Sequence, residues 1–149
     1  MIHTENRETF LSFAEVFSRS ARQCHEAEAS LRGTLGQVDE PYRQALQLIA
    51  DKERGLAREL EKYAEQGPRN LIRTHVQYRL ELDQPTHPET PGGAVQGVTR
   101  VNDELARLLS DLAEKTPADS LSDMIAALQQ EVDAITRQIS MIRVTVGDV

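Results

Sequence analysis

The sequence predicts an all-α protein, a four-helix bundle built from two antiparallel hairpins joined by a long crossover. Four segments repeat apolar residues at alternating spacings of four and three, which places the apolar side chains of each segment on one face of a helix. The chain has 149 residues, no tryptophan and only 4% aromatic residues, so aliphatic side chains must fill the core, as they usually do in helical bundles. We expect one domain spanning 1–149.

Each of the four long helices carries one apolar stripe. The first stripe comprises Phe10, Ala14, Phe17, Ala21, Cys24 and Leu31, and the second comprises Leu46, Ile49, Leu56, Leu60 and Tyr63. The third comprises Val98, Val101, Leu105, Leu108 and Leu112, and the fourth comprises Leu121, Ile125, Leu128, Val132, Ile135, Ile139 and Ile142. Carboxylates interrupt only two stripes, Glu28 in the first and Glu53 in the second, which makes these residues the first candidates for a site.

The first hairpin is expected to contain helices at about 4–32 and 39–65. Thr4 is a suitable N-cap for the first helix, and Gly33 follows its last turn. Pro41 falls in the first turn of the second helix, where proline is tolerated. The short link between them indicates antiparallel packing.

The second hairpin is expected to contain helices at about 98–115 and 117–144. Thr116, Pro117 and Asp119 follow the order of an N-cap, a proline at the first helical position and an acidic residue in the first turn. The apolar stripes predict that Leu105, Leu108, Leu112, Leu128, Val132 and Ile135 are buried together in this hairpin.

Residues 66–97 are expected to form the crossover, which is long enough to run the length of the bundle. A short helix is expected at about 69–78, whereas the alternating pattern over 76–83 leaves helix and extended chain both open. The prolines and glycines of 84–93 argue against regular structure there. Residues 92–97 are expected to form a flexible loop before the next helix.

The segment Ala50–Leu60, ADKERGLAREL, resembles the second helix of ferritin-like, rubrerythrin-type bundles. The resemblance implies the helix order described above. Members of that family bind two metal ions with a Glu from each of two helices and a Glu-x-x-His motif from each of the other two. Glu53 matches the glutamate of this motif, but Leu56 stands at the histidine position, and no Glu in the chain is followed three residues later by His. The resemblance therefore implies the fold and argues against the metal chemistry.

The candidate metal ligands are Glu53, Glu28 and His25, and we expect no metal, no cofactor and no catalytic residue. If the first turn is centred near Gly36, position 28 lies opposite position 44, and Glu53 is then about 13 Å further along the helix. Metal–oxygen bonds of about 2.0–2.6 Å do not bridge that gap. Glu28, near the end of its helix, is expected to reach water.

Glu53 lies in the middle of its helix and needs a partner if it is buried. The sequence indicates Ser18, Ser20 or Arg22 across the hairpin, or a basic group from the second hairpin.

The composition excludes several classes of function. A formal net charge of −7 argues against general binding to nucleic acid or to an anionic membrane. No segment approaches the roughly 20 apolar residues of a membrane span, and the N-terminus does not resemble a signal peptide. The single cysteine, Cys24, is expected to be a small core residue in a reducing compartment, which indicates a cytoplasmic protein.

The leading hypothesis is a non-catalytic bundle that acts through protein–protein contacts, as a homodimer. The last helix has apolar residues beyond its stripe, which one neighbouring helix would not cover: Met124, Ala127, Ala134 and Met141. The alternative is a divergent ferritin-like metal-binding protein or oxidoreductase. A third hypothesis is a small-molecule binder that uses the crossover as a lid.

Overall fold

The computed structural model describes residues 13–66, 90–115 and 119–146. Helix α1 spans Phe13–Gly33, α2 spans Tyr42–Gln66, α3 spans Pro91–Lys115 and α4 spans Asp119–Val146. A single 3-10 turn, η1 at Leu35–Gln37, lies between α1 and α2. Across these described ranges all regular structure is helical, which confirms the predicted all-α four-helix bundle.

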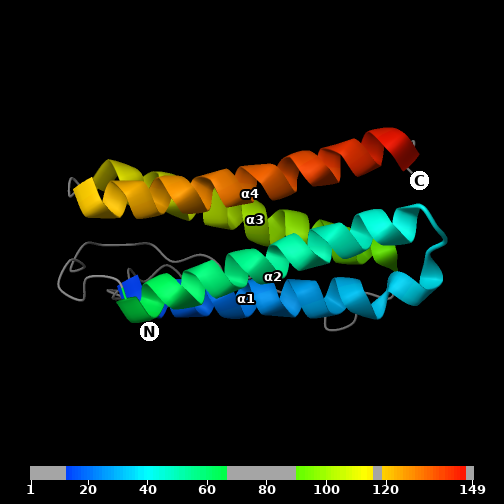
Figure 1. Ribbon diagram of the computed structural model, residues 1–149, viewed down its shortest axis with the longest axis horizontal. Coiled ribbons are helices and arrows are strands. Elements are labelled where there is room, and N and C mark those ends of the chain that lie inside the picture. The colour runs from blue at the N-terminus through cyan, green and yellow to red at the C-terminus, as the bar shows by residue number, and fades with distance from the viewer. Residues whose placement is uncertain (1–12, 67–89, 116–118, 147–149) are drawn as a thin grey trace, which may run out of the picture.

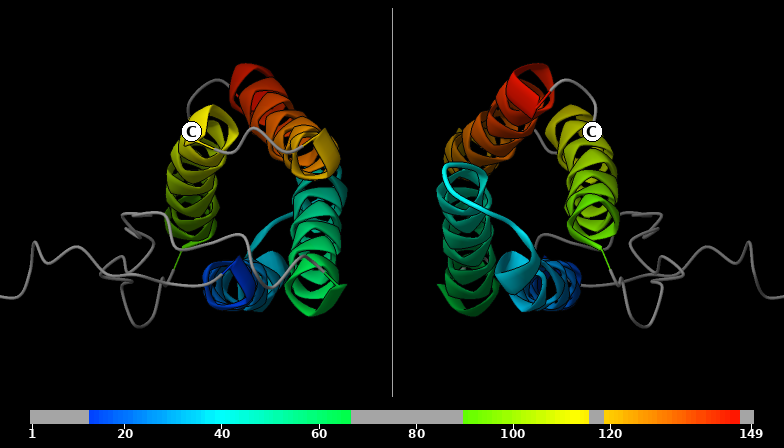
Figure 2. Two further views of the ribbon diagram at one scale, coloured as in Figure 1. Left: turned by 90° about the vertical axis from the view of Figure 1, so that its left-hand side faces the viewer. Right: turned by 90° about the vertical axis from the view of Figure 1, so that its right-hand side faces the viewer.

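The four helices lie side by side, and each packs against two neighbours. Helix α1 contacts α2 and α3, and α4 contacts the same two helices, so that α1 lies diagonally opposite α4 and α2 opposite α3 (Figure 2). Helices α1 and α4 run in one direction, and α2 and α3 run in the other (Figure 1). Helix α2 therefore ends, and α3 begins, at opposite ends of the bundle. The crossover predictions over 67–89 lie outside the described residues.

The core consists of the predicted stripes. Leu105, Leu108 and Leu112 of α3 are buried, as are Leu128, Val132 and Ile135 of α4, which confirms the prediction for the second hairpin. Cys24 of α1 is fully buried in the core, as expected. Burial of these faces is the main source of stability in a bundle of this kind, because helices in proteins are stabilised mostly by packing of their apolar face and less by intrinsic propensity.

Helix α3 begins at Pro91 rather than at position 98, so the prediction of a flexible loop over 92–97 is wrong. The reason is a cap. The Thr90 hydroxyl oxygen accepts a hydrogen bond from the Gly93 backbone N–H at 3.0 Å, and Pro91 at the first helical position has its φ already set for a helix. The helix forms from this start although Gly92 and Gly93 lie within its first turn.

The register of the first hairpin also differs from the prediction. Arg54 reaches Glu28 across the hairpin, so position 28 lies opposite position 54 and not opposite position 44. The connection is not a tight turn centred on Gly36. Helix α2 begins only at Tyr42, after η1 and a short non-helical segment, instead of at position 39.

The outer surface is mostly polar. Leu48 and Met141 are the large apolar side chains that are exposed in the described parts of the chain, with exposed fractions of 41% and 61%. None of the helices described here combines the length and the apolar character needed to cross a lipid bilayer.

Candidate functional site

Five polar side chains are buried within the described ranges: Ser20, Glu28, Thr34, Glu53 and Asn102. The hydroxyl groups of Ser20 and Thr34 donate to carbonyl oxygens of their own helix or its last turn, Val16 at 2.8 Å and Leu31 at 2.8 Å. Glu28, Glu53 and Asn102 are therefore the buried polar groups that join different helices.

Glu53 lies at the centre of the bundle, with no exposed surface, in a core cluster with Asn102 and Cys24. The Asn102 Nδ2 group donates to both carboxyl oxygens of Glu53, at 2.9 Å to Oε1 and 3.1 Å to Oε2. The Cys24 thiol forms a further hydrogen bond with the same carboxyl group. The cluster joins α1, α2 and α3, and the contact from Glu53 to Asn102 spans the diagonal between α2 and α3.

A contact within α3 shows which end of the Asn102 side-chain amide is nitrogen and which is oxygen. Its Nδ2 group also donates to the Val98 carbonyl oxygen at 2.9 Å, and a carbonyl oxygen cannot donate. The nitrogen must therefore occupy this position. As a result the Asn102 Oδ1 atom is buried without a hydrogen-bond partner. An unpaired buried acceptor of this kind destabilises a fold by about 1–3 kcal/mol.

Burial dominates the acid–base chemistry of the core cluster. It raises the pKa of Glu53 to about 7; the hydrogen bonds from Asn102 and Cys24 oppose this rise, and the nearby charge of Glu28 adds to it. Burial, together with the charge and the hydrogen bond of Glu53, raises the pKa of the Cys24 thiol well above its ordinary value. The thiol is therefore protonated at neutral pH and is a poor nucleophile.

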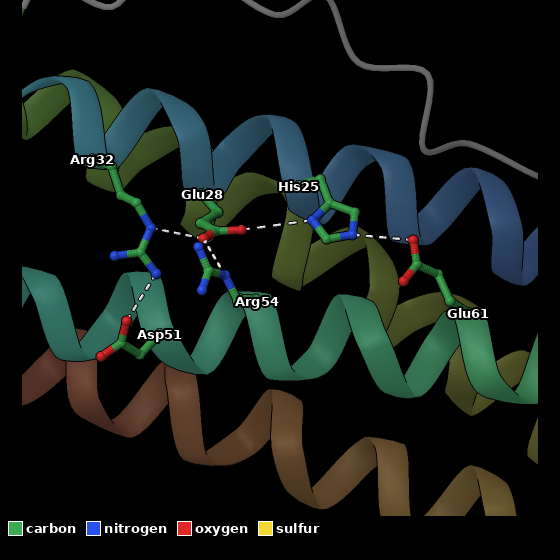
Figure 3. Close-up of polar contacts among 6 residues, drawn as sticks. All are labelled: His25, Glu28, Arg32, Asp51, Arg54 and Glu61. Atoms are coloured by element: carbon green, nitrogen blue, oxygen red, sulfur yellow. Dashed lines mark hydrogen bonds and ion pairs between the residues drawn. The ribbon is translucent and has the colours of Figure 1, made fainter.

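Glu28 has a different environment, at the seam between α1 and α2 (Figure 3). Its Oε2 atom accepts hydrogen bonds from Arg32 Nε at 2.7 Å and from Arg54 Nε at 2.9 Å. Arg32 also donates through a second nitrogen to Asp51 Oδ1 at 2.8 Å. Two guanidinium groups, one from each helix, thus surround one nearly buried carboxylate.

Charge compensation decides the acid–base behaviour of Glu28. Burial alone would raise the pKa of Glu28, but the hydrogen bonds and charges of Arg32 and Arg54 outweigh it, and the pKa lies below its ordinary value. Glu28 is therefore ionised at neutral pH, in contrast to Glu53.

His25 extends the seam toward solvent. Its Nε2 atom lies 3.1 Å from Glu61 Oε2, and its Nδ1 atom lies 3.6 Å from Glu28 Oε1. Figure 3 shows the imidazole between the two carboxylates, with α1 and α2 contributing to either side. A shallow hollow beside it is lined by Ser18, Arg22, His25, Glu26, Ala29 and Glu61.

The structure corrects two predictions about these residues. Glu28 does not reach water, because only 6% of it is exposed and two arginines hold it. Ser18, Ser20 and Arg22 are not the partners of Glu53; Asn102 and Cys24 are. Asp51, Arg54 and Glu61 of α2, which are each about half exposed, make ion pairs to α1.

The structure places the three candidate ligands with different partners. Glu53 contacts Asn102 and Cys24, Glu28 contacts two arginines, and His25 contacts Glu61 most closely. Over the described ranges, no three His, Cys, Asp or Glu side chains are placed to hold one metal ion.

Asn102 is the residue that sequence reasoning missed. It belongs to a row that runs beside the third stripe and is buried throughout, with spacings of four, three and four: Val98, Asn102, Leu105 and Leu109. That row was the signal from which the burial of Asn102 could have been predicted.

Comparison of the chain with protein-family models, with curated proteins and with solved structures finds no match.

Proposed function

We propose that this protein is a non-catalytic helical-bundle module that acts through protein–protein contacts, as a homodimer. The observation that carries the proposal is the exposure of Leu48 on α2 and Met141 on α4, two helices that pack against each other. A contiguous exposed apolar patch is a feature of protein–protein contact surfaces, so the proposal depends on these two side chains lying together.

The two side chains lie at the same end of the α2–α4 face. Glu131 of α4 is influenced by the charges of Glu59, Lys52 and Lys62, so it lies opposite the middle of 52–62. From Glu131, Met141 is about 15 Å further along α4. Because α2 runs the other way, Leu48 is displaced by a similar distance in the same direction. We call Leu48 and Met141 the end patch.

A second copy of the chain is the partner that the end patch fits best. In an interface with twofold symmetry each residue occurs twice, so Leu48 of one copy packs against Met141 of the other and the reverse. Two apolar side chains per copy form only the centre of a small interface, and small interfaces are typical of weak, transient association. We therefore expect a dimer that forms and dissociates with concentration.

Size-exclusion chromatography with light scattering at micromolar protein tests this proposal. The wild type should give a mass above that of the monomer, which falls on dilution. The double variant Leu48→Glu/Met141→Glu should be monomeric, because it places charges at the centre of the contact. Ala126→Glu, which changes an exposed position elsewhere on α4, is the matched control and should behave as the wild type. A monomeric wild type would contradict the dimer, and an unchanged double variant would contradict the end patch.

The ferritin-like relationship is part of the same proposal. What supports it is the helix order, with two antiparallel hairpins and a parallel pair α2 and α3. Elemental analysis of protein purified without chelator tests the metal-binding or oxidoreductase alternative. Stoichiometric iron, manganese or zinc would overturn the non-catalytic function.

A further inference from the structure

Glu53 is a carboxyl group at the centre of the fold whose hydrogen-bond partners are neutral. Among the residues that the structure describes, no Lys, Arg or His side chain makes an ion pair with it. A buried charge without a cation is strongly unfavourable. The protonation of Glu53 must therefore be coupled to the packing of the helices that surround it.

Among the described groups that face Glu53 from the neighbouring elements, none supplies a positive charge that would balance an ionised carboxylate. Helix α1 contributes Cys24 and the negative charge of Glu28, and α3 contributes the amide of Asn102. The buried residues described on α4 are all apolar, and its Glu131 faces Lys52, Glu59 and Lys62 instead. The 3-10 turn η1 contains no ionisable residue. Arg54, next to Glu53 on α2, is bound to Glu28.

The two protonation states of Glu53 favour different hydrogen-bond arrangements with Asn102. In the geometry described, the Nδ2 group lies close to both carboxyl oxygens and the Oδ1 atom has no partner. This arrangement suits an ionised carboxylate, which only accepts. A neutral carboxyl group has an O–H that can donate to Oδ1 while Nδ2 donates to the other oxygen. In such a reciprocal pair, reached by rotation of the Asn102 amide, Oδ1 gains a partner and the second N–H can still donate to Val98.

We propose that Glu53 and Asn102 form a proton-operated latch across the diagonal of the bundle. With the proton bound, the reciprocal acid–amide pair holds α3 of the second hairpin against the first hairpin. Loss of the proton leaves a charge and an unpaired amide oxygen in the core, and the packing of α3 against α1 loosens. The latch does not depend on the proposed dimer, because it lies inside one chain.

Cys24 provides a direct measure of this opening. Its side chain is fully buried and contacts Glu53, so a thiol reagent reaches it only when the core opens at this level. The labelling rate, divided by the rate of a free-thiol reference peptide at the same pH, gives the opening constant. The opening constant of the wild type should rise about tenfold between pH 6 and pH 8.

The variant Glu53→Gln separates the latch from other effects of pH. Glutamine keeps the reciprocal arrangement, since its amide donates to Asn102 Oδ1 and accepts from Nδ2, but it does not titrate. Its opening constant should therefore stay constant from pH 6 to pH 8. His25→Gln and Glu65→Gln are the controls: the first removes a histidine at the α1–α2 seam, and the second removes an exposed carboxylate of α2. Both should respond to pH as the wild type does.

Each outcome decides the proposal. A wild-type opening constant that does not change with pH would overturn the latch, as would a Glu53→Gln variant that keeps the full response or a His25→Gln variant that loses it. If Glu53→Gln does not fold, infrared difference spectra of the wild type decide instead. They should show the carbonyl band of a buried neutral carboxyl group at pH 6 that is lost by pH 8, and the absence of such a band would contradict the proposal.

Discussion

Glu28 and Glu53 are both buried carboxyl groups in one hairpin, yet they differ in charge state because their partners differ. Glu28 accepts from two guanidinium groups, whereas Glu53 meets an amide and a thiol. The pKa of Glu28 is accordingly lowered, and burial raises that of Glu53 to about 7. The partner, rather than the extent of burial, decides whether a carboxyl group in this bundle carries charge at neutral pH.

Removing one partner of the Glu53–Asn102 pair should destabilise the fold more than replacing both partners by apolar residues. Asn102→Leu leaves Glu53 without its amide donor, and we expect a loss of about 1–3 kcal/mol of unfolding free energy at pH 8. Glu53→Leu/Asn102→Leu removes both polar groups together and should match or exceed the wild type, by up to about 4 kcal/mol. Urea unfolding at pH 8 measures both. A double variant less stable than Asn102→Leu would contradict this expectation.

At the scale of the helix, the sequence is most informative where apolar spacing is uninterrupted. The described stripe positions of α4 from Ile125 to Ile139 are aliphatic and buried, so spacing alone predicts the buried face. The start of α3 could not be predicted from composition, because the prolines and glycines of 84–93 suggest a loop. The local signal from Thr90 and Pro91 resembles the one that was recognised at Thr116 and Pro117.

The contacts of Glu28 and Glu53 were less predictable from the sequence than the apolar stripes, because most of them depend on how different helices are placed against each other. Arg32 lies four residues after Glu28 on the same helix, a spacing that can be read from the sequence. Arg54 reaches Glu28 only in the observed register, which depends on the connection between α1 and α2. Asn102 reaches Glu53 from the diagonally opposite helix, and spacing within one hairpin contains no information about that contact.

The buried face of α4 gives a prediction about packing. Leu128 has no exposed surface, so Leu128→Ala should lower the unfolding free energy by about 2–5 kcal/mol through lost burial and a cavity. Leu48→Ala is the comparison. Because Leu48 is 41% exposed, this variant should lose much less unfolding free energy than Leu128→Ala. Chemical denaturation of both variants provides the measurement. A loss below about 0.5 kcal/mol for Leu128→Ala would mean that this position is not closely packed.

At the scale of the whole molecule, apolar faces hold the two hairpins together, and the Glu53–Asn102 contact is a buried polar link between them. The Glu28 network, by contrast, lies within the first hairpin. Protonation of Glu28 therefore acts on the packing of α1 with α2, whereas ionisation of Glu53 acts on the association of the two hairpins.

The opposite pKa shifts predict the pH dependence of global stability. Glu28 has a lowered pKa in the folded state, so its contribution is present above the ordinary value of 4.5 and is lost as the pH falls through the folded pKa. Glu53, with a pKa raised from 4.5 to about 7, binds a proton in the folded state that the unfolded chain has lost, so stability falls as the pH rises across that range. The two effects together place the maximum near pH 5.

Denaturant unfolding from pH 3 to pH 9 tests this profile. From pH 5 to pH 8 the wild type should lose up to about 3 kcal/mol, since one pKa unit corresponds to about 1.4 kcal/mol. Glu53→Gln should remove the loss of unfolding free energy between pH 5 and pH 8 and leave the loss below pH 5 unchanged. Glu28→Gln should do the reverse, with a smaller effect, because Arg54 is about half exposed and solvent screens its charge. A wild-type maximum above pH 7 would show that Glu53 is ionised in the folded protein at neutral pH without cost, and that the latch does not operate.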